Sequence, residues 1–476
     1  MVDMRNASRL ANGLWTLPLA LTLAVSGCGT SAATDMGATE TKSPVAAEAS
    51  ASERTTITDD TDNGHAIAAS AEEASYTATD VTKTGEADGD EADFYGTNAA
   101  VYAEEGATLT LDDMTVTTNG THANAVFSYG EGTTVNISDS TIDTTGNCSG
   151  GIMVTGGGVL NATNLTVHTT GNSSAAIRSD RGGGTQDVTG GTYATDGTGS
   201  PAIYSTADVT VHDATLTSTA SQGVVVEGKN SATLDNVDLT ASNTTKNSDK
   251  SDWYQAVMIY QSMSGDAAEG EASFTMNGGS LTNTNGDVFF VNNTVATINL
   301  TNATIANQDE SGVLARLAAA GWGSEGSNGG HVTLNASKQT LDGDIVVDGV
   351  SELNMYLAGG SSYTGAINQA NEGSVFVQIE AGSTWKLTGD SYVSSLTCEA
   401  NAIDLNGHTL YVDGEAYDAS SASTGNAIEF TLPQSSGRPD GMPGEPGEGM
   451  GEPPAKPDGE GGPGGHGGEP PAKPKA

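Results

Sequence analysis

An apolar residue at the start of a strand-like segment returns at nearly constant spacing through residues 101–313. The first steps are 25 or 26 residues long, as from Val101 to Val126 and from Val126 to Ile152. A second series keeps a constant phase with the first, so that Val116 precedes Val126 by 10 residues. Two series in phase indicate one supersecondary unit stacked many times, because periods of about 20–50 residues are typical of solenoids and propellers. The first series is Val101, Val126, Ile152, Ile177, Ile203, Val224, Val257, Val288 and Val313, and the second is Val116, Ile142, Val167, Tyr193, Leu216, Leu239, Leu281 and Ile305.

The sequence around these residues has the alternation of a β-strand. In residues 133–137 (Thr-Thr-Val-Asn-Ile) apolar and polar side chains alternate and β-branched residues dominate. Glycine-rich turns such as residues 182–184 separate the segments, and no copy contains a helical pattern. Short strands without helices predict an all-β fold, a right-handed parallel β-helix solenoid of about twelve coils. We assign residues 76–415 to this single domain.

The first 27 residues have the organisation of a bacterial export signal. Arg5 and Arg9 precede an apolar run, Leu14–Val25, that is too short to cross a bilayer. The run ends in Val-Ser-Gly-Cys, which resembles the lipobox of bacterial lipoproteins. The resemblance implies a signal peptide over 1–27, lipidation of Cys28, and anchoring of the mature protein on the extracellular face of a bacterial membrane. The alternative is an ordinary signal peptide that happens to contain Cys28.

The segments on either side of the predicted β-helix lack the apolar residues that a folded core requires. Residues 28–75 are mainly Ala, Thr, Ser, Asp and Glu, a composition that predicts a disordered linker. Residues 416–476 are predicted to form a linker and a low-complexity tail of Pro, Gly and Glu, in which the sequence of residues 452–457 recurs at 469–474.

The chain is strongly acidic, since 60 Asp and Glu residues against 17 Lys and Arg give a net charge of −43. Nucleic-acid binding requires basic patches, so nucleic acid is excluded as a partner. Acidic groups collect Ca²⁺ loosely, but the Asp-rich loops of calcium-binding motifs are missing from the sequence, and we expect no cofactor. Cys148 and Cys398 are separated by about nine coils, or about 40 Å. This distance excludes a disulfide between them.

Many parallel β-helices cleave polysaccharides, so catalysis is the first alternative function. Such chemistry requires paired carboxylates, or an Arg or Lys base beside calcium-binding carboxylates. The polar residues that most resemble a functional site are Arg178, Asp180 and Arg181. We interpret them as part of a solvated turn with an internal Arg–Asp pair. We therefore predict no catalytic residue, and a polysaccharide lyase or glycoside hydrolase of pectin-lyase-like fold stays as the alternative. The histidines of the body share no register and are predicted to lie at the surface: His122, His168, His212 and His331.

A second alternative is ice- or crystal-surface binding. The residue before each member of the second series is usually threonine, as at Thr115, Thr141 and Thr166. An ice-binding plane needs another regular column two residues further on, and that column is broken by Asp143 and His168. Threonine also packs well on β-sheets for structural reasons. We therefore favour a structural role for the threonine column.

Three insertions interrupt the repeat, and insertions mark where function is added to a solenoid. The first carries Trp253 and Tyr254, and the third carries Trp322. Flat aromatic rings suit sugar rings or a protein partner, so these three residues form our candidate ligand platform. The alternative is that they hold the loops against the coil. The insertions lie at residues 241–254, 262–271 and 315–330, the last two at the same corner of the coil.

Several strings in the body look typical of one group of proteins, among them residues 94–101 (Phe-Tyr-Gly-Thr-Asn-Ala-Ala-Val), 149–154 (Ser-Gly-Gly-Ile-Met-Val), 175–184 and 260–266. Because of these strings and the repeat, residues 76–415 resemble the right-handed parallel β-helix surface proteins of bacteria that are called adhesin-like. The resemblance implies a surface-displayed, non-catalytic protein used in attachment to carbohydrate or to another cell surface. It transfers no catalytic residues to this chain.

Overall fold

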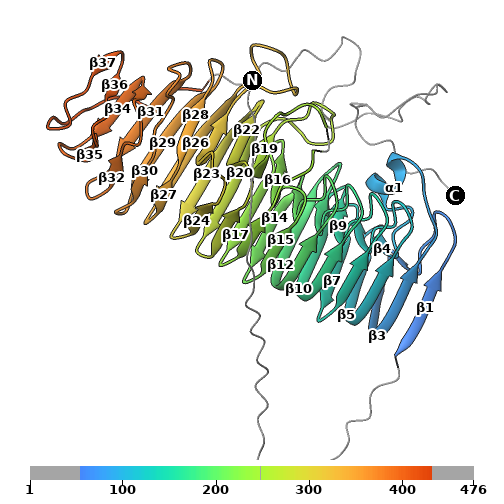
Figure 1. The fold of residues 1–476 in the computed structure, drawn as a ribbon. Helices are drawn as coiled ribbons and strands as arrows, with labels where there is room; N and C mark the ends of the chain where they lie inside the picture. Colours follow the sequence, from blue (N-terminus) through green and yellow to red (C-terminus); the bar gives the residue numbers. More distant parts are fainter. Residues whose placement is uncertain (1–53, 247, 431–476) are drawn as a thin grey trace, which may run out of the picture. The chain divides into compact units, whose positions relative to one another are not determined.

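The computed structural model describes residues 54–246 and 248–430. In these residues β-strands predominate, and α1 (Asp90–Tyr95) is the only helix. The strands form two long sheets, which we call sheet A and sheet B, and a small sheet C (Figure 1). The strands of sheets A and B pair in parallel, as the repeat predicted, whereas β36 and β37 of sheet C pair antiparallel.

Sheet A has 23 strands: β1 (Thr55–Asp59), β3 (Glu73–Lys83), β5 (Thr108–Thr118), β7 (Thr134–Ser138), β8 (Thr141–Thr144), β10 (Gly158–Thr169), β12 (Gly184–Thr195), β14 (Asp208–His212), β15 (Thr215–Ser218), β17 (Ser231–Asp235), β18 (Asp238–Ala241), β20 (Glu271–Asn277), β21 (Ser280–Asn283), β23 (Thr294–Thr301), β24 (Thr304–Asn307), β26 (Gly330–Ser337), β27 (Thr340–Asp342), β29 (Glu352–Ala358), β30 (Ser362–Thr364), β31 (Ser374–Ile379), β32 (Thr384–Lys386), β34 (Ser395–Cys398) and β35 (Ile403–Asp404). Sheet B has 11 strands: β2 (Ile67–Ser70), β4 (Val101–Glu104), β6 (Val126–Tyr129), β9 (Ile152–Thr155), β11 (Ile177–Ser179), β13 (Ile203–Ser205), β16 (Val224–Glu227), β19 (Gln255–Tyr260), β22 (Asp287–Asn292), β25 (Val313–Leu317) and β28 (Asp344–Val347). Sheet C comprises β33 (Ser391–Val393), β36 (Leu410–Val412) and β37 (Glu415–Ala416).

Each coil in the body contributes one strand to sheet B and one long strand, or two short ones, to sheet A. The chain passes from β4 in sheet B through β5 in sheet A to β6 in sheet B, and β6 then lies beside β4. In the same way β7 and β8 both pair with β5. This stacking is that of a parallel β-helix, so the predicted all-β solenoid is confirmed, and the 11 strands of sheet B are close to the expected coil number.

The second apolar series of the sequence forms one continuous internal column. Each of its eight members pairs with the next, from Val116 beside Ile142 to Leu281 beside Ile305. Leu216, in the middle of the column, is fully buried. Stacking the same apolar position in every coil builds one core between the sheets, which no single coil could bury alone.

The structure confirms the first apolar series through Val257. In the next strand the observed inward position lies one residue after the predicted one. Val257 pairs with Phe289 instead of Val288, and Phe289 in turn pairs with Ala315 instead of Val313. Residues 288–290 are all apolar and all buried, so the sequence offers no alternation from which the register could be read. At Val313 the pairing with β28 is irregular, which displaces the column a second time.

The β-helix begins earlier than predicted, because β1 and β2 both lie within residues 28–75. β1 pairs with β3 along its whole length. Beside it, the Nε atom of Arg54 lies 2.7 Å from Asp80 Oδ1, and Arg54 Nη1 lies 2.8 Å from Asp113 Oδ1. Backbone pairing and these ion pairs order a segment whose composition is poor in apolar residues. The linker boundary at residue 75 was therefore wrong, and the rest of that linker lies outside the described residues.

The predicted linker after residue 415 is also folded in its first part. The side chain of Asn354 in β29 donates to Ile428 O and accepts from Ile428 N, both at 2.9 Å. The ring of Phe430 lies 6.1 Å from that of His331. His331 is buried and bonds Glu352 at 2.8 Å, so the prediction that it lies at the surface was wrong. The segment folds back on sheet A through backbone bonds, which composition does not reveal.

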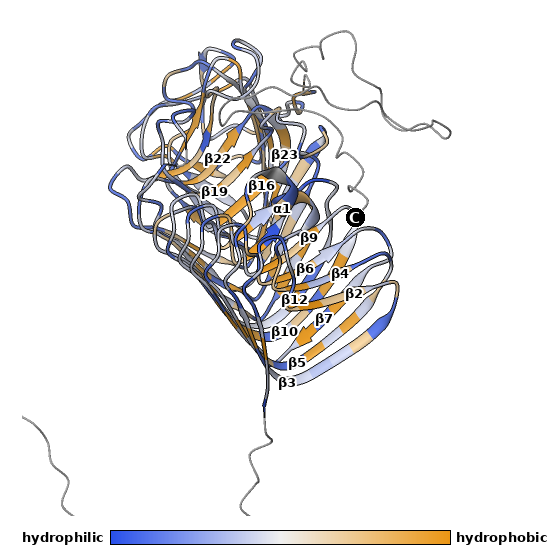
Figure 2. Cartoon of the chain, turned by 90° about the vertical axis from the view of Figure 1, so that its right-hand side faces the viewer, coloured by the Kyte–Doolittle hydropathy of each residue, from blue (hydrophilic) through white to orange (hydrophobic). Residues whose placement is uncertain are grey.

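The outer faces of the two sheets differ. Outward residues of sheet A are largely polar and at least partly exposed, and some pair along the stack, as Asn161 does with Asn136 at 2.8 Å. Most strands of sheet B are buried on both faces, and β19 and β22 have no exposed residue, whereas β2 at the end of the sheet exposes every second residue. In Figure 2, β16, β19 and β22 are coloured hydrophobic, whereas many of the turns are hydrophilic. Something must therefore cover the outside of sheet B.

Replacing Leu216 by Ala should lower the free energy of unfolding by about 2–5 kcal/mol, because it leaves a cavity in a close-packed column. Urea unfolding followed by circular dichroism measures the loss. Thr215→Ala, one residue away on the exposed face of the same strand, is the matched control and should change the midpoint little. Equal effects of the two substitutions would contradict the assigned register.

Candidate functional site

The outer face of sheet B carries one column of residues, which we call the outer column. Each member directly follows the inward-facing position of its strand and pairs with the next member along the stack. Most members are apolar or aromatic, but two are arginines, and a buried arginine requires partners. The outer column comprises Tyr102, Phe127, Met153, Arg178, Tyr204, Val225, Met258, Phe290 and Arg316.

The helix α1 covers part of the outer column. The residue that caps its C-terminal end is Gly96, whose φ of 68° lies in the left-handed region. A Cβ atom at Gly96 would lie 2.8 Å from ring atoms of both Tyr102 and Phe127, so glycine permits this close approach. Thr155 also donates a hydrogen bond of 2.7 Å to Phe94 O in α1. These contacts hold α1 against the sheet and direct Asp93 toward Arg178.

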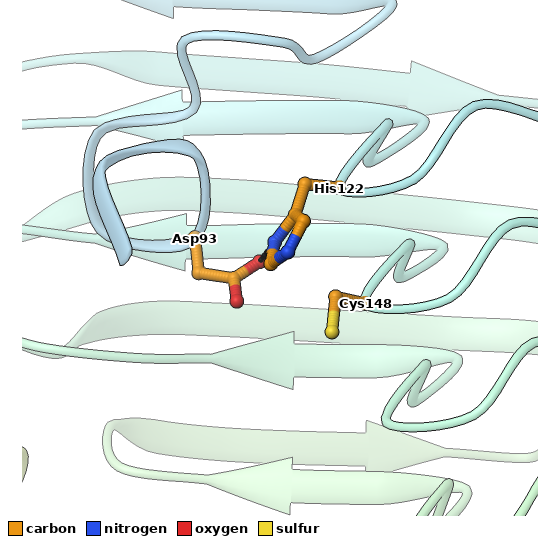
Figure 3. A group of neighbouring side chains, drawn as sticks. All are labelled: Asp93, His122 and Cys148. Carbon is orange, nitrogen blue, oxygen red and sulfur yellow. Dashed lines mark ion pairs between the residues drawn. The ribbon is translucent and has the colours of Figure 1, made fainter. Parts of the chain in front are cut away.

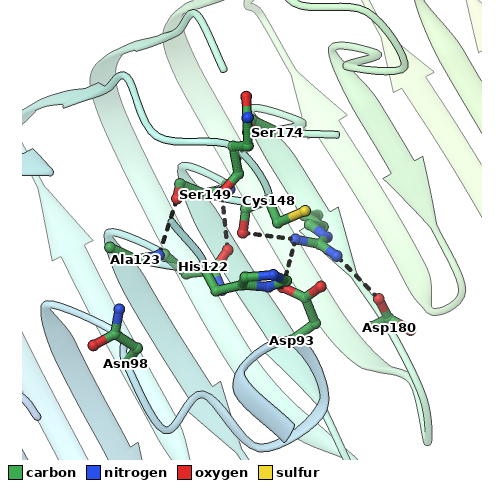
Figure 4. A network of polar contacts seen from close by, with 12 residues as sticks. Asp93, Asn98, His122, Ala123, Cys148, Ser149, Ser174 and Asp180 are labelled. Carbon is green, nitrogen blue, oxygen red and sulfur yellow. Dashed lines mark hydrogen bonds and ion pairs between the residues drawn. The ribbon is translucent and has the colours of Figure 1, made fainter. Parts of the chain in front are cut away.

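Arg178, Asp180 and Asp93 form a charged cluster beneath α1, and Figure 4 shows the two aspartates of this cluster. Arg178 Nη1 lies 3.2 Å from Asp93 Oδ1, and Nη2 lies 3.3 Å from Asp180 Oδ2. Arg178 and Asp180 are each only 8% exposed. The expected pairing of Arg178 with Asp180 is present, but the interpretation as a solvated turn was wrong, because α1 folds over it.

Arg181 links α1 to the loop that follows β19. Its guanidinium carbon lies 3.8 Å from the centre of the Phe94 ring. Its Nε atom donates to Asp266 Oδ1 in residues 261–270. A cation stacked on an aromatic ring and paired with a carboxylate ties together two segments that are distant in sequence.

His122 and Cys148 lie at the edge of the same cluster (Figure 3). His122 Nδ1 lies 3.1 Å from Asp93 Oδ1, and the His122 side chain is 15% exposed. The prediction that His122 is a surface residue was therefore wrong. The physical reason is again α1, which brings Asp93 to a corner that would otherwise face solvent.

The ionisation of this cluster reflects burial and charge together. Burial alone would raise the pKa of Asp93, but the charge of Arg178 and the contact with His122 hold that pKa below its usual value. Contact with Asp93, and then with Cys148, raises the pKa of His122 to about 10. Burial raises the pKa of Asp180 to about 7, although Arg178 opposes the shift. Two carboxylates in one cluster thus differ in acidity.

A second buried carboxylate lies on the next coils. Glu227 Oε2 accepts hydrogen bonds from the hydroxyls of Tyr204 at 2.5 Å and of Tyr260 at 3.0 Å. Burial raises the pKa of Glu227, while its hydrogen bonds, including those from the two tyrosines, oppose the shift. The two neutral hydroxyls bond one carboxylate oxygen, Oε2, without supplying a countercharge, and the buried Oε1 atom makes no hydrogen bond.

Two loops from opposite corners meet over the C-terminal part of the outer column. Residues 242–254 connect β18 to β19, residues 318–329 connect β25 to β26, and Gly321 N donates to Lys250 O at 2.7 Å. We call these segments the loop pair. The remaining insertion, residues 261–270, leaves the coil at the same corner as residues 318–329. Its Asp266 accepts a hydrogen bond from Arg181.

Two of the three aromatic residues of the predicted ligand platform, Trp253 and Trp322, pack against the same cluster of buried residues on sheet B. The Trp253 ring lies 5.6 Å from that of Phe290, and the Trp322 ring lies 5.1 Å from that of Tyr260. Trp253, Tyr254 and Trp322 are all half-buried. The two tryptophans thus make the contacts of loop anchors and leave part of each ring at the surface.

Three cations accompany these rings. Arg316 Cζ lies 4.8 Å from the Trp253 ring centre, Lys246 Nζ lies 5.3 Å from that of Tyr254, and Lys250 Nζ lies 5.8 Å from that of Trp322. Arg316 is also paired with Asp287 at 2.6 Å. Lys246 Nζ likewise lies 4.0 Å from Asp252 Oδ1, so two of the three cations have a carboxylate partner.

Comparison with models of protein families, with curated proteins and with solved structures finds no match to this chain. In the part of the chain that the structure describes, no helix is long and apolar enough to cross a membrane. The predicted lipidation site, Cys28, lies outside the described residues. Cys148 and Cys398 are both free thiols, in agreement with the prediction that they do not pair.

The sequence missed Asp93 and Asp266 as partners of the arginines, and Glu227 as a buried carboxylate. One signal was available, because Arg178 follows Ile177 of the first series and so occupies a position that is apolar or aromatic in most coils. An arginine there predicts a buried charge that needs carboxylates. Which carboxylates meet it depends on how α1 and the loops fold back, and no spacing encodes that.

Replacing Glu227 by Gln should change how stability depends on pH. The folded pKa of Glu227 is raised, so its contribution is fully present below the unfolded pKa of about 4.3 and is lost as pH rises through the folded value. The wild type should therefore lose stability relative to E227Q as pH rises, with Tyr204, Tyr260 and Asp266 facing the group. Urea midpoints from pH 4 upward measure the difference. The exposed Glu131→Gln controls for charge, and a constant difference between wild type and E227Q would contradict the argument.

Replacing Trp322 by Ala should destabilise the protein by about 1–3 kcal/mol, because the ring loses its packing on Tyr260. Thermal unfolding measures the loss as a lower Tm. Asp252→Ala is the control within the loop pair, since that side chain is 96% exposed. An unchanged Tm for W322A would show that the ring does not anchor the loop.

Proposed function

We propose that this protein is a non-catalytic, adhesin-like β-helix that is displayed on a bacterial cell surface and binds carbohydrate through the loop pair. The observation that carries the proposal is the grouping of Trp253, Tyr254 and Trp322 with three cations. The resemblance of the body to adhesin-like surface proteins supports the same function. Cys28 would supply the lipid anchor on the extracellular face of the membrane.

The chemistry of the loop pair suits a sugar with an acidic group. Flat aromatic faces present apolar surface to sugar rings and keep polar atoms at their edges. Lys246 and Lys250 would attract a carboxylate or sulfate, which the rest of this acidic chain would repel. The ligand class is therefore an acidic saccharide, held between ring faces and lysine side chains.

Hydrogen bonds within and between the two loops also support binding. Asn328 donates to the carbonyl oxygens of Ala320 at 2.7 Å and of Trp322 at 2.8 Å, and it is buried. Together with the bond from Gly321 to Lys250, these contacts fix the loops before a ligand arrives. Preorganised loops lose less conformational entropy on binding than mobile ones.

A glycan array with the full chain carrying Cys28→Ser, which cannot be lipidated, tests this function. We expect binding to acidic glycans that falls about tenfold or more, equivalent to about 1.4 kcal/mol, in Lys250→Ala and in Tyr254→Ala. These positions are chosen because the tryptophans also anchor the loops. Lys386→Ala, an exposed lysine on β32, is the matched control and should leave binding unchanged.

Other outcomes would overturn the proposal. A blank array with a folded protein would favour a protein partner, and equal losses in K386A would show a general charge effect. Shortened glycans recovered from the array would favour the alternative, a polysaccharide lyase or glycoside hydrolase. Running the array with calcium and with a chelator tells whether a loosely bound Ca²⁺ is needed.

A further inference from the structure

We propose that Asp93, His122 and Cys148 bind a divalent transition-metal ion such as Zn²⁺, in a site independent of the carbohydrate-binding function. One carboxylate oxygen, one imidazole nitrogen and the thiol sulfur of these residues lie within 4.8 Å of one another. Figure 3 shows the three side chains near one another, Asp93 from α1 and His122 and Cys148 from two successive turns. This is the one such group of three or more His, Cys, Asp and Glu side chains in residues 54–246 and 248–430.

The distances fit a metal site after a small adjustment. With metal–ligand distances of about 2.0–2.3 Å in a tetrahedral site, ligand atoms lie about 3.3–3.7 Å apart. The three ligand atoms are now separated by up to 4.8 Å, so they must move about 1 Å closer together to bind one metal ion. Rotation of half-buried side chains is enough for such a change, with the backbone left in place.

The backbone places two of the ligands by the same repeat that builds the fold. His122 and Cys148 occupy equivalent turn positions in successive coils, since His122 N donates to Asn147 O and Cys148 N donates to Asn172 O, both at 2.8 Å. Both residues have a φ of 55°. Equivalent positions in stacked coils are about 4.8 Å apart, a separation that one metal ion can bridge.

The Nδ1 atom of His122 is a second observation that points to a ligand. It is buried and lies 3.1 Å from Asp93 Oδ1, but outside hydrogen-bond geometry. A buried polar atom without a hydrogen bond is costly, and a metal ion next to it would remove that cost. The donor set therefore contains an imidazole whose Nδ1 atom is in ion-pair contact with Asp93 but makes no hydrogen bond.

The surroundings of the site supply orientation and countercharge. Arg178 Nη1 donates to Asp93 Oδ1 at 3.2 Å and to Cys148 O at 3.3 Å, so it orients both ligand residues. Its positive charge disfavours a nearby cation, but Asp180 also pairs with it at 3.3 Å. Asp93 and a Cys148 thiolate supply two negative charges, which balance those of the metal ion.

The ligand types select the class of metal. Thiol and imidazole ligands suit zinc and other transition metals, whereas calcium and magnesium prefer sites made of oxygen atoms. Three protein ligands leave one tetrahedral position for water or for another molecule. The site thus differs in kind from the loose calcium binding expected of an acidic chain.

Titration with Zn²⁺ under reducing conditions, followed by calorimetry, tests the site in the full chain with Cys28→Ser. We expect one site of stoichiometry one, weakened about 100-fold or more in Cys148→Ser and in His122→Asn. Both substitutions fit the backbone, because Ser173 has a φ of 54° at the equivalent position and Asn63 a φ of 53°. Replacing Zn²⁺ by Co²⁺ should give a thiolate absorption band that C148S lacks.

Matched variants separate this site from other thiols and imidazoles. Cys398→Ser and His212→Ala remove the same chemical groups elsewhere in the β-helix and should leave the affinity unchanged. Binding that survives both C148S and H122N, or no Zn²⁺ binding by the folded chain, would overturn the proposal. Unchanged thermal unfolding of H122N without metal would show that its weaker binding reflects a lost ligand.

Discussion

Parallel backbone pairing between successive coils is the interaction on which the rest of this structure depends. Each inner strand of sheet B hydrogen-bonds to the coil before it and the coil after it, and the register keeps like positions above one another. The apolar column that contains Leu216 exists only because this register holds over many coils. A one-residue slip would turn every inward side chain outward.

Burial of sheet B on both faces imposes a second requirement. The strand pairing leaves the outer column open, so α1 and the loops must cover it. Where the column is apolar, as at Phe290, the cover is aromatic. Where it contains Arg178, the cover supplies Asp93 from α1. Arg316, by contrast, lies against the Trp253 ring and pairs with Asp287 of the neighbouring strand β22.

This arrangement concentrates the unusual chemistry of the molecule on one side. Sheet A presents polar side chains that pair along the stack, as Asn335 does with Asn299 at 2.9 Å. The buried carboxylate of Glu227, the cations beside aromatic rings and the His122–Cys148 corner all lie on sheet B or on the segments that cover it. Segments outside the regular coils are free to vary without disturbing the backbone pairing, so they can acquire new groups.

The sequence by itself determined the parallel β-helix, the whole second series and most of the first, because stacking repeats the same burial pattern at a fixed spacing. It also identified Arg178, Asp180 and Arg181 as a polar group, and Trp253, Tyr254 and Trp322 as insertion-loop aromatics. Only the tertiary structure decided that Arg178 is buried, that Asp93 reaches His122, and that two loops from opposite corners meet. These contacts join segments of unrelated spacing, as Arg181 and Asp266 show. Periodicity encodes contacts between equivalent positions, whereas the covering contacts depend on chain paths that have no period.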